Sequence, residues 1–230
     1  MKTLYVFDND GTLYDDAGTQ KQFMEIFYRY ASGLLATSQE NVATIIHSLK
    51  TKHGTEFSLI ALMREFNINY EDMVNNTYLQ VTLGECGIVS PDIVRYQTLS
   101  QIIGPKVVFT NNPSAFAKKV LSYTGLTELF SDFIGMEELE FSGKPSIRSF
   151  EIIENHHRGF DQIIFVDDLV KNLDVAKQRG WKTVWYNPIG VSTELEHRHL
   201  FISSFNDITK NNIFFSFFIY YCLLSMVSKT

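Results

Sequence analysis

Polar side chains follow three apolar segments of this sequence, at the point where each segment ends. They are Asp8 and Asp10, Thr110 and Asn111, and Asp167 and Asp168. If the segments are parallel strands, these residues meet, because the carboxyl ends of parallel strands form one edge of a sheet. Four carboxylates at one edge repel one another, and a cation or a bound proton must offset that repulsion. Because every ligand is an oxygen, we expect a hard ion, Mg²⁺, as the cofactor.

A lysine is placed to add positive charge to the same edge. Lys144 lies between Gly143 and Pro145, at the expected junction of a loop and a helix, from which its side chain can reach inward. Taken singly, these residues have ordinary interpretations: a turn at Asp10-Gly11-Thr12, a helix N-cap at Asp167-Asp168 and a solvated charge at Lys144. Their joint occurrence, in this order along the chain, favours one shared site.

The segments that position these residues alternate between strand and helix patterns. Short continuous apolar runs predict strands buried on both faces at residues 4–7, 106–110, 133–135, 162–166 and 183–186. Helices are expected after the second strand, after Pro145 and from Asp168 to Gly180. Strands that alternate with helices predict an α/β fold, a doubly wound parallel sheet with a Rossmann-like core.

The helix after the second strand carries signals at both of its ends. Asn112 is expected to be the N-cap and Pro113 the first helical residue, since proline lacks the N–H that this position does not use. Gly125 is the expected C-cap, because glycine tolerates the left-handed conformation.

Residues 18–88 have helical periodicity throughout. Apolar residues recur at helical spacing in three stripes, which begin at Phe23, Val42 and Leu59. We therefore expect an all-helical cap at residues 18–88. It would be inserted into a Rossmann-like catalytic core formed by residues 1–17 and 89–210.

The final segment, residues 211–230, is a hydrophobic tail of unknown role. Its apolar stretch, residues 213–227, is shorter than the about 17 to 25 residues that a membrane-spanning helix needs. A core element or an atypical tail is therefore favoured over a membrane anchor, and a membrane is expected as a partner only through this tail.

The composition excludes some classes of protein. The formal charge of −6 and the pI of about 5.5 lack the basic excess of a nucleic-acid-binding protein, so no nucleic-acid partner is expected. The two cysteines, Cys86 and Cys222, form no CxxC pair, which disfavours a disulfide framework or a structural zinc site. We expect a cytoplasmic protein.

Four segments together resemble the motifs of the haloacid dehalogenase-like hydrolase superfamily. They are Asp8-Asn9-Asp10-Gly11-Thr12-Leu13-Tyr14, Phe109-Thr110-Asn111, Gly143-Lys144-Pro145 and Phe165-Val166-Asp167-Asp168. The resemblance implies that Asp8 is a nucleophile that attacks phosphorus. Asp10 would protonate the leaving oxygen and later activate water, and Lys144 would steady both the phosphate and the nucleophile.

The resemblance also implies the binding roles. Thr110 and the backbone of Asn111 would hold phosphate oxygens. Asp168, Asp8 and the carbonyl of Asp10 would bind Mg²⁺ directly, and Asp167 would bind it directly or through water. Many relatives carry another aspartate four positions after the metal-binding one. Position 172 is asparagine here, so the role of that carboxylate is expected to be absent.

The expected activity is hydrolysis of a small phosphate monoester. The superfamily also contains dehalogenases, but halide leaves without a proton and does not need the acid that Asp10 supplies. The opening motif, Lys52-His53-Gly54-Thr55 and the segment from Val166 to Leu173 are similar to the pyrimidine 5'-nucleotidase group, although His53 alone is expected to be a solvated residue at a helix end.

Other functions on the same fold stay open. A sugar phosphate or phosphoglycolate is the alternative substrate. A phosphotransferase, a mutase or a non-catalytic tail-anchored protein is less favoured, the last because both Asp8 and Asp10 are present.

Overall fold

A parallel β-sheet forms the centre of the molecule. The computed structural model describes residues 1–190 and 198–210. In these residues six strands lie in the order β3-β2-β1-β4-β5-β6, and every pair is parallel. The strands are β1 (Thr3–Phe7), β2 (Lys106–Phe109), β3 (Asp132–Ile134), β4 (Gln162–Asp167), β5 (Lys182–Tyr186) and β6 (Leu200–Ile202). The α/β, doubly wound fold is therefore confirmed; β6 was not predicted, because a run of three residues carries no periodicity.

The strand register brings the polar strand ends to one level. Phe7, the last residue of β1, pairs with Val108 of β2 and with Val166 of β4. The Asp8 amide then donates to the Val166 carbonyl at 2.9 Å, so Asp8 continues the pairing one residue beyond the strand. Residues that follow these three strands consequently share one edge of the sheet.

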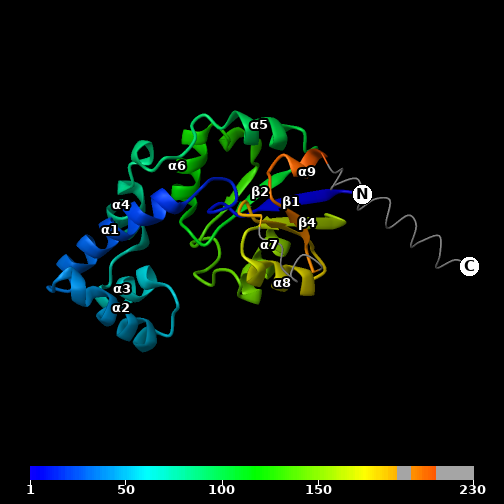
Figure 1. The fold of residues 1–230 in the computed structure, drawn as a ribbon. Helices are drawn as coiled ribbons and strands as arrows, with labels where there is room; N and C mark the ends of the chain where they lie inside the picture. Colours follow the sequence, from blue (N-terminus) through cyan, green and yellow to red (C-terminus); the bar gives the residue numbers. More distant parts are fainter. Residues whose placement is uncertain (191–197, 211–230) are drawn as a thin grey trace, which may run out of the picture.

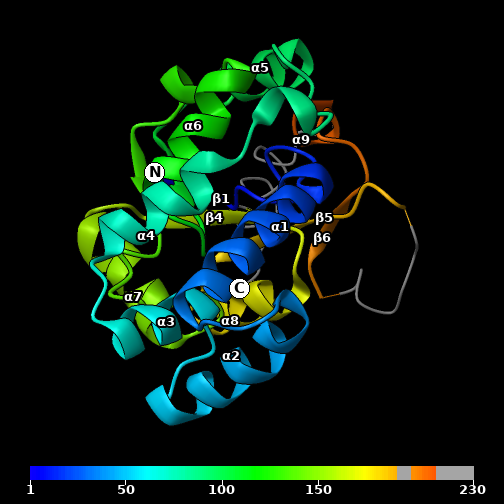
Figure 2. The same ribbon diagram turned by 90° about the vertical axis from the view of Figure 1, so that its left-hand side faces the viewer.

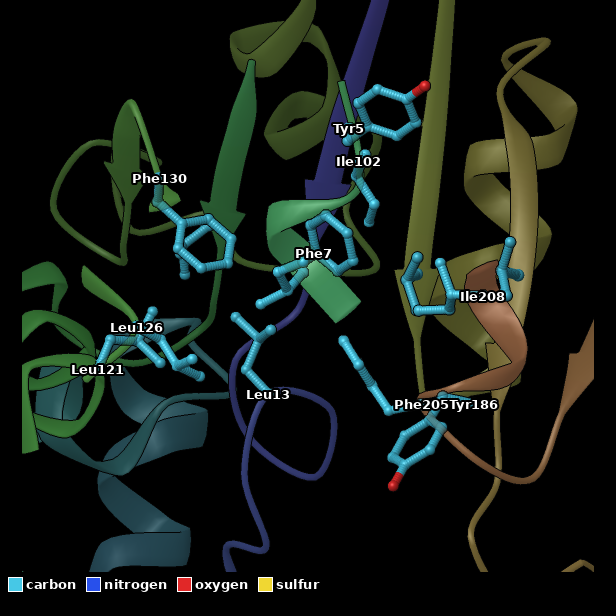
Figure 3. Close-up of a cluster of buried hydrophobic side chains, with 14 of the residues drawn as sticks. Tyr5, Phe7, Leu13, Ile102, Leu121, Leu126, Phe130, Tyr186, Phe205 and Ile208 are labelled. Carbon is cyan, nitrogen blue, oxygen red and sulfur yellow. The ribbon is translucent and has the colours of Figure 1, made fainter. Parts of the chain in front are cut away.

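Helices cover both faces of the sheet (Figure 1). On one face lie α5 (Ile93–Ser100), α6 (Ser114–Thr124) and α9 (Asp207–Lys210), with a 3₁₀ turn, η3, at Thr127–Leu129. The other face carries α7 (Ile147–His156) and α8 (Val170–Gln178). Each face has its own buried cluster, and Figure 3 shows the first, in which the Phe7 ring meets Phe130 at 5.9 Å between centroids.

The inserted helices lie to one side of the sheet, as Figures 1 and 2 show. They are α1 (Ala17–Leu34), α2 (Gln39–His53), α3 (Ser58–Phe66) and α4 (Tyr70–Asn76), followed by 3₁₀ turns η1 (Tyr78–Gln80) and η2 (Leu83–Glu85). These helices pack around a separate hydrophobic cluster that includes Phe27, Val42, Ile46, Leu62 and Met73. The cap and core boundaries given above stay a prediction.

The start of α6 differs from the prediction. Pro113, and not Asn112, is the N-cap residue, and the helix begins at Ser114. The Asn112 side chain is used elsewhere, because its Oδ1 accepts a hydrogen bond from Tyr78 at 2.8 Å. The Glu137 carboxylate instead accepts the first helical N–H, that of Ser114, at 3.1 Å. The predicted C-cap at Gly125 is confirmed, with φ of 77°.

The hydrophobic tail, residues 211–230, lies outside the described residues. Within residues 1–190 and 198–210, the helices are all too short or too polar to cross a membrane.

Phe150 of α7 supports a test of how strongly the sheet and its helices are coupled. Its ring is fully buried and meets Phe109, Phe165 and Trp181 at 5.3, 6.1 and 5.3 Å between centroids. We expect Phe150→Ala to lower the free energy of unfolding by about 3–5 kcal/mol, because a large cavity replaces the ring. Ile147→Ala, an exposed position on the same helix, should change it by less than about 0.5 kcal/mol. Urea unfolding measures both, and equal effects would contradict the packing described.

Candidate active site

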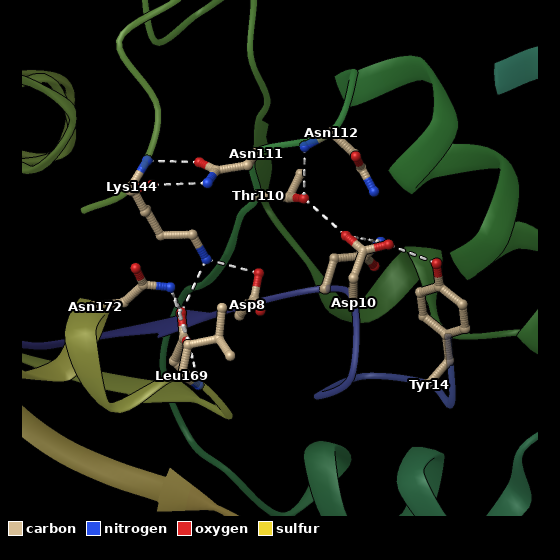
Figure 4. Close-up of polar contacts among 11 residues, drawn as sticks. Asp8, Asp10, Tyr14, Thr110, Asn111, Asn112, Lys144, Leu169 and Asn172 are labelled. Carbon is tan, nitrogen blue, oxygen red and sulfur yellow. Dashed lines mark hydrogen bonds and ion pairs between the residues drawn. The ribbon is translucent and has the colours of Figure 1, made fainter. Parts of the chain in front are cut away.

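A buried ammonium group joins two carboxylates at the edge of the sheet (Figure 4). Lys144 Nζ lies 2.6 Å from Asp8 Oδ1 and 2.9 Å from Asp167 Oδ2. The three side chains are 2%, 8% and 0% exposed, so water does not screen their charges. Burial by itself lowers the pKa of Lys144, but Asp167 and Asp8 outweigh it and raise that pKa above its usual value. Lys144 therefore stays charged between them.

The side chain of Asn111 holds the lysine loop in place. Its Nδ2 donates to the Lys144 carbonyl at 2.8 Å, and its Oδ1 accepts the Lys144 amide at 2.6 Å. The Lys144 ammonium also lies over the rings of Phe109 and Phe165, at 4.9 and 5.3 Å from their centroids. Two different strands thus fix the position of one charge. The expectation concerned only the Asn111 backbone, so this contact of its side chain was missed.

Asp167 does not line the cavity described below, and both oxygens of its carboxylate accept hydrogen bonds. Besides its ion pair with Lys144, Asp167 accepts a hydrogen bond from the Leu169 amide at 2.7 Å. Both of its oxygens also accept hydrogen bonds from Asn172 Nδ2, at 3.1 and 3.0 Å. Asn172 therefore has a role as a donor, although the carboxylate found there in many relatives is absent. The sequence pattern did not predict this contact, because it depends on the phase of α8.

A third carboxylate, that of Asp168, lies close to Asp8 and Asp167 and has fewer hydrogen bonds than Asp167. One oxygen from each of Asp8, Asp167 and Asp168 lies within 4.8 Å of the others. Asp168 Oδ1 is buried and has no hydrogen-bond partner in the described part of the chain. Burial and the Asp167 carboxylate raise the pKa of Asp168 to about 6. Burial also raises the pKa of Asp8 well above its usual value, although Lys144 opposes this.

These observations fit a metal ion with oxygen ligands. Lys144 alone leaves Asp8 and Asp168 with raised pKa values, and within the described residues one buried oxygen of Asp168 has no hydrogen-bond partner. A hard divalent cation supplies the missing charge and accepts such ligands. Gly11 makes room beside Asp168: it has φ of +73°, and a Cβ there would stand 2.8 Å from Asp168 Oδ2.

Asp10 occupies the opposite side of the site and accepts hydrogen bonds from two hydroxyl groups (Figure 4). The Tyr14 hydroxyl donates to its Oδ1 at 2.5 Å, and the Thr110 hydroxyl donates to its Oδ2 at 2.9 Å. Thr110 Oγ1 in turn accepts the Asn112 amide at 3.0 Å. Asp10 is therefore held in one orientation by residues of two loops. Tyr14, four positions after Asp10, was not predicted as a site residue.

A cavity of about 420 Å³ opens onto this cluster. All the predicted site residues except Asp167 line it: Asp8, Asp10, Thr110, Asn111, Lys144 and Asp168. Side chains from the inserted helices, including Phe23, Met24 and Tyr78, complete its wall. The edge of the sheet and the helical insertion thus line one space, with charged groups on the sheet side.

The cap segment that carried part of the subgroup resemblance does not reach this cavity. His53 is the last residue of α2, as expected, but its side chain is only 18% exposed and its Nε2 lies 2.8 Å from Glu65 of α3. Lys52 bonds the same carboxylate at 2.6 Å, and Arg64 donates to the His53 carbonyl. This segment therefore ties α2 to α3.

A sequence model of one protein family matches most of this chain. The model for haloacid dehalogenase-like hydrolases matches residues 2–180. This chain belongs to the haloacid dehalogenase-like hydrolases. No curated protein matches its sequence.

Solved structures of this hydrolase family have the same fold. A HAD phosphatase from Thermococcus onnurineus superposes with a TM-score of 0.61 at 19% identity, over 91% of this chain and 97% of that one. A 2-haloacid dehalogenase from Pseudomonas syringae gives 0.63 at 19%, over 91% and 97%. The HAD-hydrolase YfnB from Bacillus subtilis, bound to magnesium, gives 0.55 at 17%, over 90% and 96%. At these identities the likeness concerns the fold alone.

The acidic cluster predicts that a metal ion stabilises this hydrolase. Adding Mg²⁺ to metal-free protein, to 100 times its dissociation constant, should raise the free energy of unfolding by about 2.7 kcal/mol. Asp168→Asn should remove most of that gain, because it replaces one carboxylate of the cluster with a neutral amide, whereas Glu40→Gln on the exposed surface of α2 should keep it. Thermal unfolding with and without Mg²⁺ measures the effect. An equal gain in wild type and Asp168→Asn would place the ion elsewhere.

Proposed function

We propose that this hydrolase cleaves small phosphate monoesters with the help of Mg²⁺, through a phosphorylated Asp8. The observation that carries the proposal is the pair of carboxylates with different surroundings, Asp8 against Lys144 and Asp10 between Tyr14 and Thr110. A carboxylate beside an ammonium group suits a nucleophile, and a second, separately held carboxyl group suits proton transfer. A dehalogenase has no need of the second group, because halide leaves without a proton.

The first half of the proposed reaction forms a bond between an Asp8 oxygen and phosphorus. The bond from phosphorus to the ester oxygen breaks, and Asp10 gives its proton to that leaving oxygen. In the second half Asp10 takes a proton from water, whose oxygen attacks phosphorus, and phosphate and the free Asp8 carboxylate result. Lys144 keeps Asp8 oriented in both halves and offsets the charge of the phosphoryl oxygens.

The remaining site residues have supporting roles in this proposal. Asp8, Asp168 and the carbonyl of Asp10 would hold Mg²⁺, with Asp167 bound to it directly or through water. When bound, the ion neutralises charge on the transferred phosphoryl group. Thr110 and the backbone of Asn111 would hold phosphate oxygens.

A pyrimidine nucleoside 5'-monophosphate is the proposed substrate. The support is the resemblance of the first and fourth motifs to the nucleotidase group. The size of the cavity adds to it, because about 420 Å³ suits a small molecule, and we expect phosphoproteins and long nucleic acids to be poor substrates. We further propose that residues 18–88 act as the cap that selects the substrate, since the sheet edge carries groups for phosphate and metal.

The nucleophile is tested by replacing Asp8. Asp8→Asn should lower kcat by about a thousandfold or more, because an amide does not attack phosphorus, while the protein stays folded. Asp15→Asn, an exposed aspartate close in sequence, should keep full activity. The assay is release of phosphate from a panel of monoesters. Substantial turnover by pure Asp8→Asn protein would sink the mechanism.

The role of Asp10 is tested by changing the leaving group. Asp10→Asn should slow hydrolysis of an alkyl or ribose phosphate by about 10²- to 10⁴-fold, because an oxygen of high pKa must be protonated as it leaves. Hydrolysis of 4-nitrophenyl phosphate should fall much less, since nitrophenolate leaves without a proton. The measurement is kcat/KM on both substrates in wild type and variant. Equal losses would make Asp10 a structural residue.

The substrate proposal is tested by kcat/KM across nucleoside monophosphates and sugar phosphates, since this ratio reports discrimination between substrates. Uridine and cytidine monophosphates should exceed the purine nucleotides by about tenfold or more. A clear preference for phosphoglycolate or a hexose phosphate would overturn the substrate and leave the phosphatase proposal standing.

A further inference from the structure

The inserted helices line a second cavity of about 420 Å³, which is open to solvent on one side and which the reaction proposed above does not use. It lies among α1, α2 and the start of α3, the group of helices nearest the viewer in Figure 2. Five of its lining side chains are aromatic: Phe23, Phe27, Tyr28, Phe57 and Tyr78. We call this space the aromatic compartment.

The aromatic compartment adjoins the active-site cavity. Phe23, Met24 and Tyr78 line both spaces, so the two cavities meet at these residues. Two further contacts tie the compartment to the loops of the site. The Tyr78 hydroxyl donates to Asn112, two residues after Thr110, at 2.8 Å. The Phe57 ring lies so close to Gly143, the residue before Lys144, that a Cβ at Gly143 would stand 2.3 Å from Phe57 Cζ.

Aromatic rings stack on one another where the two cavities meet. Phe23 stacks on Tyr78 at 4.1 Å between centroids, with 24° between the ring planes. Phe23 also stacks on Phe27 at 5.7 Å and 23°. Near-parallel rings favour a planar ligand that continues the stack, and such stacking does not require a charge on the ligand.

One face of α2 gives the compartment its polar side. Ala43, Ile46, His47 and Lys50 recur at helical spacing and line the space together. Lys50 is 27% exposed and its Nζ lies 3.6 Å from Glu56, which leaves further N–H donors on the ammonium group. A ligand that stacks on the rings and carries carbonyl acceptors would match both sides.

We propose that the aromatic compartment holds the leaving group of the substrate, and that this group contains a planar ring with hydrogen-bond acceptors, as a nucleobase does. This inference rests on the proposed phosphatase function and adds a requirement to it. The phosphate lies against Asp8 and Lys144, and the ring of the same molecule lies beyond Phe23 and Tyr78. A small aliphatic phosphate fills the first cavity only.

Blocking the compartment from its exposed side tests the inference. Ala43 is exposed, so Ala43→Trp fills the space without disturbing the core of the helices. Ser48→Trp places the same bulk on an exposed part of α2 that does not line the compartment and is the matched control. The measurement is kcat/KM for uridine monophosphate, which carries a ring, and for phosphoglycolate, which does not.

Ala43→Trp should lower kcat/KM for uridine monophosphate by about tenfold or more, the loss expected when a stacked base is displaced. Its value for phosphoglycolate should stay within about twofold, and Ser48→Trp should change neither. Equal losses on both substrates, or none, would overturn the inference. So would a wild type that hydrolyses phosphoglycolate and not uridine monophosphate, which leaves the phosphatase function intact.

A binding measurement separates this inference from the chemistry. Calorimetry with Mg²⁺ present gives the affinity of Asp8→Asn protein for uridine monophosphate without turnover. Adding Ala43→Trp to that protein should weaken binding by about tenfold. If the wild type hydrolyses neither substrate, the proposed function fails and this comparison alone decides the inference. Equal affinity, or no binding, would overturn it.

Discussion

The ammonium group of Lys144, buried between Asp8 and Asp167, is the interaction on which the site depends. Two carboxylates this close together and this far from water repel each other strongly. The lysine makes their approach tolerable, with distances of 2.6 and 2.9 Å. It does not satisfy the whole cluster, because the pKa values of Asp8 and Asp168 remain raised. The folded chain therefore contains a site with an excess of negative charge that favours a cation.

The fold creates this constraint through the register of three adjacent strands. Because Phe7 pairs with both Val108 and Val166, the chain leaves β1, β2 and β4 at one level. Hydrogen bonds then fix each side chain from a neighbouring loop. The Asn111 amide holds the lysine loop, and the Asn172 amide holds Asp167. Nucleophile and lysine are positioned by different elements, so their geometry depends on the whole sheet edge and not on one motif.

The sequence was sufficient to predict strands β1 to β5 and the convergence of the site residues at one edge of the sheet. The apolar runs at residues 4–7 and 162–166 end one residue or less from the observed ends of β1 and β4, since a buried parallel strand leaves an uninterrupted pattern. The acidic residues at the ends of these strands, Asp8 and Asp10 after β1 and Asp167 and Asp168 at the end of β4, must then lie at the same edge of the sheet. α5 was not predicted, because its exposed apolar residues Ile93 and Val94 weaken the helical pattern.

Contacts between amide and hydroxyl side chains were beyond the sequence pattern. The role of Asn172 depends on the phase of α8, and that of Tyr14 on the turn that returns it to Asp10. The N-cap was placed one residue early at Asn112, because the competing hydrogen bond from Tyr78 comes from 34 residues away in the chain. Such interactions are set by tertiary structure, and local propensity does not reveal them.

The most direct test of the account is to look for phosphate on Asp8 during turnover. Protein mixed with Mg²⁺ and a hydrolysed monoester would be quenched in acid within the first turnovers, digested and analysed by mass spectrometry. We expect a phosphoryl group on the peptide that contains Asp8, located at that residue, and none in Asp8→Asn protein. Steady hydrolysis with no phosphorylated Asp8, or with the phosphoryl group on another residue, would contradict it.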